Sequence, residues 1–207
     1  WYLGQKTMSI QQRVVLVEKL FHQLEQETTK FTQTTGIGCV SGCGKCCTSP
    51  HVEASPLEFL PWAFHLFLNG EAKKMLASLN ENQSATCIIY KALSISGKGS
   101  CSNYKYRGLI CRLFGFAANT DKYGNLRLAT CKIIKEDQTD IYNSTAEAIT
   151  KGLHVPVFTE YYMQLNQIDF NLGNMIVPIN KALKMALEEV LQYYAYRPSP
   201  DVDKKCV

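Results

Sequence analysis

The chain has 207 residues, 46% of them hydrophobic, and a formal net charge of +4 from 22 basic and 18 acidic residues. This length and apolar content suffice for one domain with a substantial core, and so mild a charge without a dense basic run excludes a dedicated nucleic-acid-binding protein. No apolar run reaches the roughly 18–20 residues of a membrane span, and the N-terminal residues lack the apolar segment of a signal peptide. We therefore expect a cytoplasmic protein that binds neither nucleic acid nor membrane.

Residues 9–35 are expected to form one long amphipathic helix. One helical stripe repeats at alternating steps of four and three residues and consists of Ile10, Val14, Val17, Phe21, Leu24, Thr28 and Phe31. Ser9 and Gln12 predict a capping box at the start of the helix, and Gly36 or Gly38 predicts its end. Residues 1–35 are thus an N-terminal helical region that either packs on the core or offers a surface to a protein partner.

Four of the nine cysteines lie in the segment Cys39–Cys47, which reads C-V-S-G-C-G-K-C-C. Three cysteines follow the spacing C-x3-C-x2-C, and a fourth comes directly after them. The glycines allow a tight turn from which several thiolates can converge on a metal, and reduced cytoplasmic thiols favour metal binding over disulfides. Adjacent Cys46 and Cys47 are expected to lie on extended backbone and to point in different directions, so we predict that they do not bind one centre in the same manner.

Two helices are expected after the cysteine loop. Residues 48–54 are expected to be extended, and residues 55–58 (Ser-Pro-Leu-Glu) supply an N-cap, a proline at the first helical position and a glutamate at the third. Pro61 is unfavourable inside this helix and is expected to delay or kink it. Gly70 ends it, and a second short helix is expected over residues 71–79.

The later cysteines are expected in and around β-structure. Residues 87–90 (Cys-Ile-Ile-Tyr) predict a short strand, and Cys101 and Cys111 can each deliver one further ligand. The turn-rich run 119–125 lies between two partly apolar segments. It predicts a hairpin that brings Cys131 back toward Cys111.

The last third of the chain has a helical pattern. Helices are expected over residues 140–151, from Pro156 and from Pro178. Residues 134–198 are therefore interpreted as a C-terminal helical region, and residues 199–207 as a flexible tail. The predicted fold class is mainly α with small β-hairpins, in a single domain that the metal site staples together.

The order of the cysteine motifs is specific when the two parts are taken together. After the Cys-Cys pair comes a stretch that reads C-x-N-Y-x-x-R-x-x-x-C-R-x-F-x-F. This arrangement resembles the YkgJ-type cysteine-cluster proteins, a bacterial family described as a zinc- or iron-chelating domain, and the resemblance covers about residues 36–133. The matching residues are Cys39, Cys43, Cys46 and Cys47, then Cys101, Tyr104, Arg107, Cys111, Arg112, Phe114 and Phe116. Asn103, Gly108 and Gly115 replace an isoleucine and two prolines of the family pattern, which we expect to loosen the turns.

Eight cysteines are candidate metal ligands. They are Cys39, Cys43, Cys46, Cys47, Cys87, Cys101, Cys111 and Cys131. A sulfur-only donor set suits an iron–sulfur cluster or Zn²⁺ and excludes hard cations. Four thiolates complete one [4Fe–4S] cluster or one Zn²⁺, so eight allow two sites or one site with spare thiols. Lys45 and Arg112 adjoin cysteines and are predicted to offset the negative charge of the bound cofactor, and His51 is a further candidate ligand.

Three functions are consistent with this pattern. The first is a metal-binding protein with a [4Fe–4S] cluster in a redox, sensing or accessory role. A cluster is favoured over zinc because radical S-adenosylmethionine enzymes share the C-x3-C-x2-C spacing, but the helix before the motif and the lack of a βα series after it argue against the fold of those enzymes. The second is a cluster-dependent enzyme such as a protein methyltransferase using S-adenosylmethionine, which a resemblance to flagellin lysine methylases implies. The third is a zinc-stapled interaction module whose N-terminal helix docks a partner. A site closed by four cysteines favours the module, whereas a cluster held by three favours the enzyme.

Overall fold

The computed structural model describes residues 8–39, 43–82, 84–92 and 99–200. The expectations for the N-terminal residues, for Cys206 and for the tail beyond residue 200 concern residues outside these ranges. The fold is mainly α with small two-stranded antiparallel sheets, as predicted. Across the described ranges, no helix combines the length and the hydrophobicity that a membrane crossing requires.

The predicted N-terminal helix is confirmed as α1, Ile10–Thr35. Ser9 and Gln12 form the expected capping box, and Gly36 ends the helix with φ +75°, a left-handed conformation that glycine adopts without strain. The expected apolar stripe is buried against the rest of the protein, except for the half-buried Thr28. Each fully buried side chain of this kind stabilises the fold by about 1.5–3 kcal/mol. Of the two alternatives for this helix, packing on the core is the one that the structure shows, and a partner would have to bind its outer face.

The two helices expected after the cysteine loop are α2, Pro56–Leu68, and α3, Ala72–Glu81. Glu58 closes a capping box with Ser55 at the start of α2, as predicted. Pro61 lies inside α2 without delaying its start, so this part of the expectation is wrong. The helix is buried over most of its length, and this tertiary packing offsets the loss of one backbone hydrogen bond.

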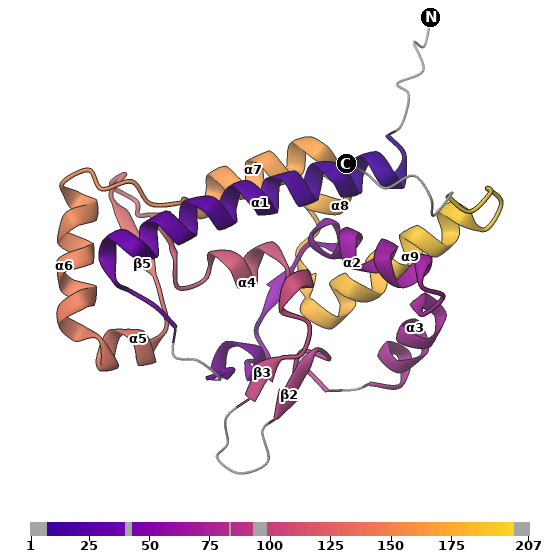
Figure 1. Ribbon diagram of the computed structural model, residues 1–207, viewed down its shortest axis with the longest axis horizontal. Coiled ribbons are helices and arrows are strands. Elements are labelled where there is room, and N and C mark those ends of the chain that lie inside the picture. Colours follow the sequence, from indigo (N-terminus) through magenta and orange to yellow (C-terminus); the bar gives the residue numbers. More distant parts are fainter. Residues whose placement is uncertain (1–7, 40–42, 83, 93–98, 201–207) are drawn as a thin grey trace, which may run out of the picture.

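The C-terminal region packs back onto α2. It contains α7 (Phe158–Ile168), α8 (Phe170–Gly173) and α9 (Ile179–Tyr194), and α9 lies against α2 in Figure 1. β1 (Glu53–Ala54) pairs antiparallel with β6 (Val177–Pro178), so the segment that leaves the cysteine loop is attached to the start of α9. These helices and α1 share the larger of two hydrophobic cores.

A half-buried ion-pair network also joins α1 to the C-terminal region. The Arg13 guanidinium donates to Asp169 Oδ2 at 2.6 Å and to Glu189 Oε1 at 2.8 Å. Only 9% of the Arg13 side chain is exposed, so its charge depends on these two carboxylates for compensation.

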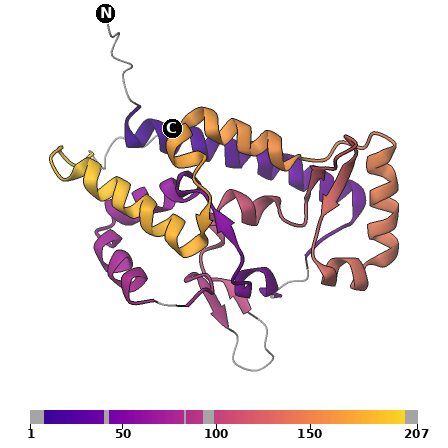
Figure 2. The ribbon, with the colours of Figure 1, turned by 180° about the vertical axis from the view of Figure 1, so that it is seen from behind.

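A second, smaller lobe lies at the far end of α1 (Figures 1 and 2). The predicted hairpin is confirmed as β4, Ala117–Thr120, and β5, Leu126–Ala129. α5, Lys132–Asp137, was not expected, and α6, Thr139–Thr150, is the helix predicted over residues 140–151. The smaller core of this lobe consists of Phe31, Ile37, Ala118, Leu128, Ile134, Ile149 and Val155.

Short elements connect the two lobes and carry four of the cysteines, Cys46, Cys47, Cys101 and Cys111. They are η1 (Lys45–Thr48), β2 (Tyr90–Ala92), β3 (Gly99–Cys101), η2 (Tyr104–Tyr106) and α4 (Leu109–Leu113). In Figure 1 these elements lie below α1, between α6 at one end of the molecule and α3 at the other. The candidate site is therefore built at the junction of the lobes.

Candidate metal centre

The predicted ligands converge. All eight candidate cysteines line a single cavity with a volume of about 1440 Å³. They come from the loop after α1, the turn before β2, the end of β3, the middle of α4 and the N-cap of α5. Segments that are far apart in the sequence thus supply thiols to one space.

The Cys-Cys pair lies in a helical turn. Cys46 and Cys47 belong to the 3₁₀-helix η1, so the expectation of an extended backbone at this pair is wrong. The turn begins at Gly44 with φ +57°, and a Cβ at that position would lie 2.4 Å from the carbonyl oxygen of Gly99. Glycine is therefore required both by the left-handed conformation and by the close approach of the β2–β3 hairpin. This contact fixes the loop against the strand that carries Cys101.

The two adjacent thiols interact directly. A hydrogen bond from the Cys47 thiol lowers the pKa of Cys46, and the same bond raises the pKa of Cys47. The sulfur of Cys46 is thus the member of the pair that ionises more readily. A thiolate is the form that binds metal, and this hydrogen bond favours the thiolate of Cys46.

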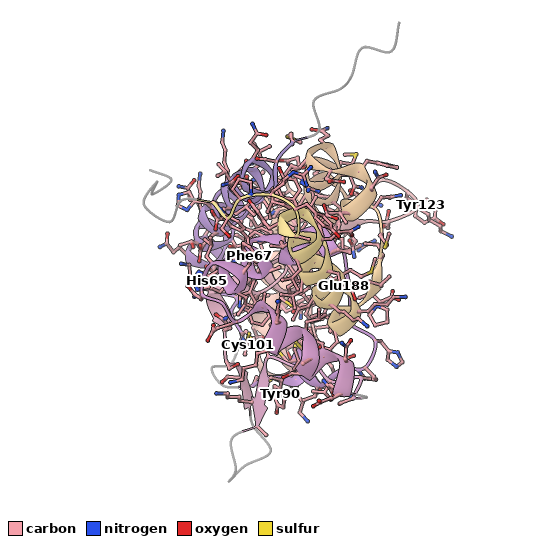
Figure 3. The ribbon with its side chains drawn as sticks, turned by 90° about the vertical axis from the view of Figure 1, so that its right-hand side faces the viewer. His65, Phe67, Tyr90, Cys101, Tyr123 and Glu188 are labelled. Carbon is pink, nitrogen blue, oxygen red and sulfur yellow. The ribbon has the colours of Figure 1, made fainter. Side chains whose placement is uncertain are left out.

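Cys87 and Cys101 are held together by backbone hydrogen bonds. The predicted strand over residues 87–90 is displaced: β2 begins at Tyr90, which is paired with Cys101 in the sheet register. Figure 3 shows Tyr90 and Cys101 close together at the end of the molecule that carries this hairpin. The amide of Cys87 donates to the carbonyl oxygen of Cys47 at 3.3 Å, which attaches the turn before β2 to η1.

Cys111 is positioned by a buried carboxylate. Glu58 Oε2 accepts a hydrogen bond from the amide of Ile110 at 3.0 Å, at the first turn of α4. A Cβ on Gly108 would lie 2.9 Å from the same oxygen, so the absence of a side chain there lets the carboxylate reach the turn. Burial raises the pKa of Cys111, and the neighbouring Glu58 raises it further. A metal that binds this sulfur must therefore displace a tightly held proton.

Cys131 is the N-cap of α5, and its sulfur accepts a hydrogen bond from the amide of Ile134 at 3.5 Å. The β4–β5 hairpin brings it back to the cavity that Cys111 also lines. At the other end of α5, the side chain of its C-cap Gln138 donates to the Gly38 carbonyl at 2.6 Å and accepts from the Gly38 amide at 3.2 Å. Cys39, the next residue, is therefore held in the same lobe as Cys131.

One of the two expected cations lies at the site and the other does not. Lys45 lines the cavity, whereas Arg112 is not among its lining residues. The Arg112 guanidinium donates to the carbonyl oxygens of Lys105 and Arg107 and lies over the Phe21 ring, and burial lowers its pKa to about 10. Arg112 thus stabilises the loop before α4 from the side facing α1.

Arg107 is the guanidinium that lines the cavity. It stacks on the Tyr104 ring, and its charge lowers the pKa of Cys39, Cys46 and Cys101, although burial outweighs it at Cys39 and Cys101. Sequence reasoning placed Arg107 in the second cysteine motif without assigning it this role. The sequence carried no signal for this choice, because the backbone turn before α4 decides which arginine of the motif faces the thiols.

The thiols surround the cavity without forming a closed ligand group. Among the side chains that the structure describes, no three from Cys, His, Asp and Glu are gathered closely enough to hold one metal ion. Four sulfurs around one Zn²⁺ would lie only about 3.8 Å apart, as 2.3 Å bonds at tetrahedral angles require. The donor chemistry fits a thiolate-bound metal, and loading must draw the thiols inward or bridge them with a larger group.

Part of the cavity lining comes from the C-terminal region and is largely apolar. It includes Phe158, Tyr162, Asn166, Ile176 and Ile179, and His51 lies at the same cavity. Asn166 Oδ1 is buried and has no hydrogen-bond partner within the described ranges. Sequence reasoning missed this part of the lining because aromatic and aliphatic residues at helical spacing are indistinguishable from ordinary core residues.

Comparison with protein families agrees with this geometry. A model named CxxCxxCC, described as "Putative zinc- or iron-chelating domain", matches residues 38–147 and thus includes all eight cavity cysteines. The present chain has three residues between Cys39 and Cys43, where the motif in that name has two. The match extends through α5 into α6, beyond the boundary at residue 133 that the sequence suggested. Searches of curated proteins and of solved structures found no match.

Proposed function

The chain belongs to the CxxCxxCC family of zinc- or iron-chelating domains, and from this premise we propose that it is an iron–sulfur protein with a redox, sensing or accessory role. The observation that carries the proposal is the spread of eight thiols around one cavity of about 1440 Å³. An iron–sulfur cluster places its cysteine ligands on different iron atoms, so its ligands stand farther apart than those of a single zinc ion. When bound, such a cluster would supply one-electron transfer or bind a ligand at an open iron.

The chain's own residues have separate tasks in this proposal. The eight cysteines supply the thiolates, and Arg107 and Lys45 place positive charge at the cavity, which offsets the negative charge of thiolate-bound iron. Glu58 holds the turn that carries Cys111. The apolar side chains from α7 and α9 would lower the polarity around a bound cluster, which is one determinant of its potential.

A second candidate is a cluster-dependent enzyme, such as a methyltransferase that uses S-adenosylmethionine. The volume of the cavity favours it, because pockets of about 300–1,000 Å³ already hold most drug-sized molecules and this one is larger. This candidate requires an iron that no cysteine holds, so a change in the cluster's electron paramagnetic resonance signal on adding S-adenosylmethionine would support it.

The test of the proposed function is an anaerobic purification followed by metal and sulfide analysis. We expect a brown protein with iron and acid-labile sulfide in equal amounts, at least about four of each per chain, and with visible absorption that bleaches on reduction. Exposure of half of the sample to air provides the control, because exposed clusters are lost with oxygen. A colourless protein with one or two zinc ions and no sulfide would overturn the proposal in favour of a zinc-stapled interaction module.

A further inference from the structure

Cys87 is a buried thiol of the cavity, with 8% of the residue exposed. It lies in an irregular segment between α3 and β2, so no helix or strand fixes the direction of its side chain. A side chain in such a segment is held ready for a metal only if other parts of the fold fix its backbone.

Asn180, in the first turn of α9, supplies such support. Its Nδ2 donates to the carbonyl oxygens of Thr86 at 2.8 Å and of Ser84 at 3.2 Å. Its Oδ1 accepts from the amide of Ile88 at 2.9 Å. Because carbonyl groups only accept and amides donate, these partners also determine which end of the carboxamide faces which neighbour. The three bonds hold the backbone on both sides of Cys87.

The backbone groups of Cys87 itself are also bonded. Its amide donates to the carbonyl oxygen of Cys47 at 3.3 Å, and its carbonyl oxygen accepts from the amide of Tyr90 at 2.9 Å. Asn180 is the member of this arrangement that acts through a side chain, whereas the other bonds join backbone groups. Substitution of Asn180 therefore removes the support without changing the segment that carries the cysteine.

The same end of α9 is attached to the segment that leaves the cysteine loop. The amide of Ile179 donates to the carbonyl oxygen of Val52 at 3.0 Å, beside the pairing of β1 with β6. This helix lies outside residues 38–147, the part of the chain that the family model matches. A support for one of the cavity thiols thus comes from beyond the matched domain.

We propose that Asn180 is a positioning residue for the metal centre, which holds the thiol of Cys87 at the cavity as a metal ligand. Asn180 is not among the residues that line the cavity, so it acts through the backbone next to Cys87. Replacing residues that orient metal ligands typically weakens metal binding by about 10–100-fold. The inference rests on the proposed function only in that the cysteines bind metal, and it applies to an iron–sulfur cluster and to zinc alike.

The experiment is a double-mutant cycle on the full-length chain, purified without oxygen. Its members are wild type, Asn180→Ala, Cys87→Ser and the double variant. Metal and sulfide per chain are measured, together with the rate at which EDTA removes the metal. Lys181→Ala, at the exposed next position of α9, is the first control. Arg13→Met is the second, because it removes an ion pair with α9 and so separates a loss of stability from a loss of positioning.

We expect Asn180→Ala to lose metal to EDTA about 10–100-fold faster than wild type, whereas Lys181→Ala and Arg13→Met keep the wild-type rate. In the Cys87→Ser background, Asn180→Ala should have no further effect, because the ligand on which it acts is absent. Asn180→Asp should behave like Asn180→Ala. Its carboxylate can still accept from the Ile88 amide but cannot donate to the two carbonyl oxygens.

A second readout is the alkylation of individual cysteines in metal-free protein, measured by mass spectrometry. Asn180→Ala should raise the alkylation rate of Cys87 about tenfold, the factor that corresponds to losing one hydrogen bond of ordinary strength, and leave the rate of Cys131 unchanged. This readout decides the case in which Cys87→Ser already binds no metal, since the cycle then has no remaining metal to report on.

Three outcomes would overturn the inference. Full metal content and a wild-type rate of metal loss in Cys87→Ser would mean that Cys87 is not a ligand. An unchanged rate in Asn180→Ala would mean that its hydrogen bonds are not needed. Equal effects of Asn180→Ala with and without Cys87, or equal acceleration of alkylation at Cys87 and Cys131, would mean that Asn180 only stabilises the fold.

These results are distinguishable from those that test the proposed function. Zinc without sulfide, together with the expected cycle, would support the role of Asn180 and overturn the iron–sulfur proposal. Iron with equal sulfide, together with any of the three contrary outcomes, would do the reverse.

Discussion

Glu58 offers the sharpest test of how the fold prepares the site. Its side chain is 1% exposed and accepts hydrogen bonds from the Ser55 amide at 2.8 Å, the Ser55 hydroxyl at 3.1 Å and the Ile110 amide at 3.0 Å. Glu58→Ala would leave the amides of Ser55 and Ile110, both at helix starts, without a hydrogen-bond acceptor. Each buried amide that lacks an acceptor destabilises the fold by about 1–3 kcal/mol. We therefore expect the free energy of unfolding of metal-free protein to fall by about 2–5 kcal/mol, measured by urea denaturation.

The chain contains a matched control for this variant. Ser9 and Gln12 form the same capping box at the start of α1, but there the bonds are exposed. Gln12→Ala should cost no more than about 0.5–1 kcal/mol and leave the metal content unchanged. Glu58→Ala should lower the metal content as well, because the turn that carries Cys111 loses its support. Equal destabilisation by the two variants, or full metal content in Glu58→Ala, would refute the reasoning.

The pH dependence of the metal-free protein gives a second readout for Glu58. Burial raises the pKa of Glu58 above its ordinary value of 4.5, although the hydrogen bonds from Ser55 and Ile110 lower it. The folded state thus binds the proton of the Glu58 carboxyl more tightly than the unfolded state does. The stability that this protonation contributes is present below pH 4.5 and is lost as the pH rises through the raised pKa of Glu58. Glu58→Gln removes this titration. Its stability should change less with pH above 4.5 than that of wild type, and identical slopes would contradict the assignment.

Three further predictions concern other parts of the fold. Arg13→Met should destabilise the protein by about 2–4 kcal/mol in urea denaturation because it leaves two half-buried carboxylates uncompensated, whereas Lys151→Met, at an exposed pair, should cost less than about 0.5 kcal/mol. Gly44→Ala should lower metal content and melting temperature because its Cβ would meet backbone at 2.4 Å. Gly36→Ala, also left-handed but with open space around it, should lower only the melting temperature. Arg107→Met should shift the thiolate absorbance of metal-free protein to higher pH, since three thiols lose a nearby cation; an unchanged titration would contradict this.

The parts of the fold that the sequence predicted well are those with local signals. α1 and α2 start at capping boxes, and the β4–β5 hairpin follows from its turn residues. Predictions from local signals were wrong where tertiary contacts determine the backbone conformation. η1 is helical because Gly44 packs against Gly99, a contact that no residue near Cys46 reveals. β2 starts at Tyr90 because its partner strand ends at Cys101.

The candidate site follows the same distinction. The eight cysteines could be selected as candidate metal ligands from their number and spacing, because closely spaced cysteines that form no disulfides usually bind metal or take part in redox chemistry. The choice between Arg107 and Arg112 could not be made in this way. Both belong to one motif, and the turn that α4 makes after Gly108 sends one guanidinium into the cavity and the other to carbonyl oxygens near α1.

The arrangement of the cores bears on what metal binding does for this protein. A small zinc finger is unfolded without metal because it has little else to bury. Here α1, α2 and α9 bury a large apolar core that includes few of the thiols, so the larger lobe has stability of its own. The smaller lobe buries far fewer side chains, and Cys131 packs against them. We therefore expect metal binding to stabilise the smaller lobe more than the larger one.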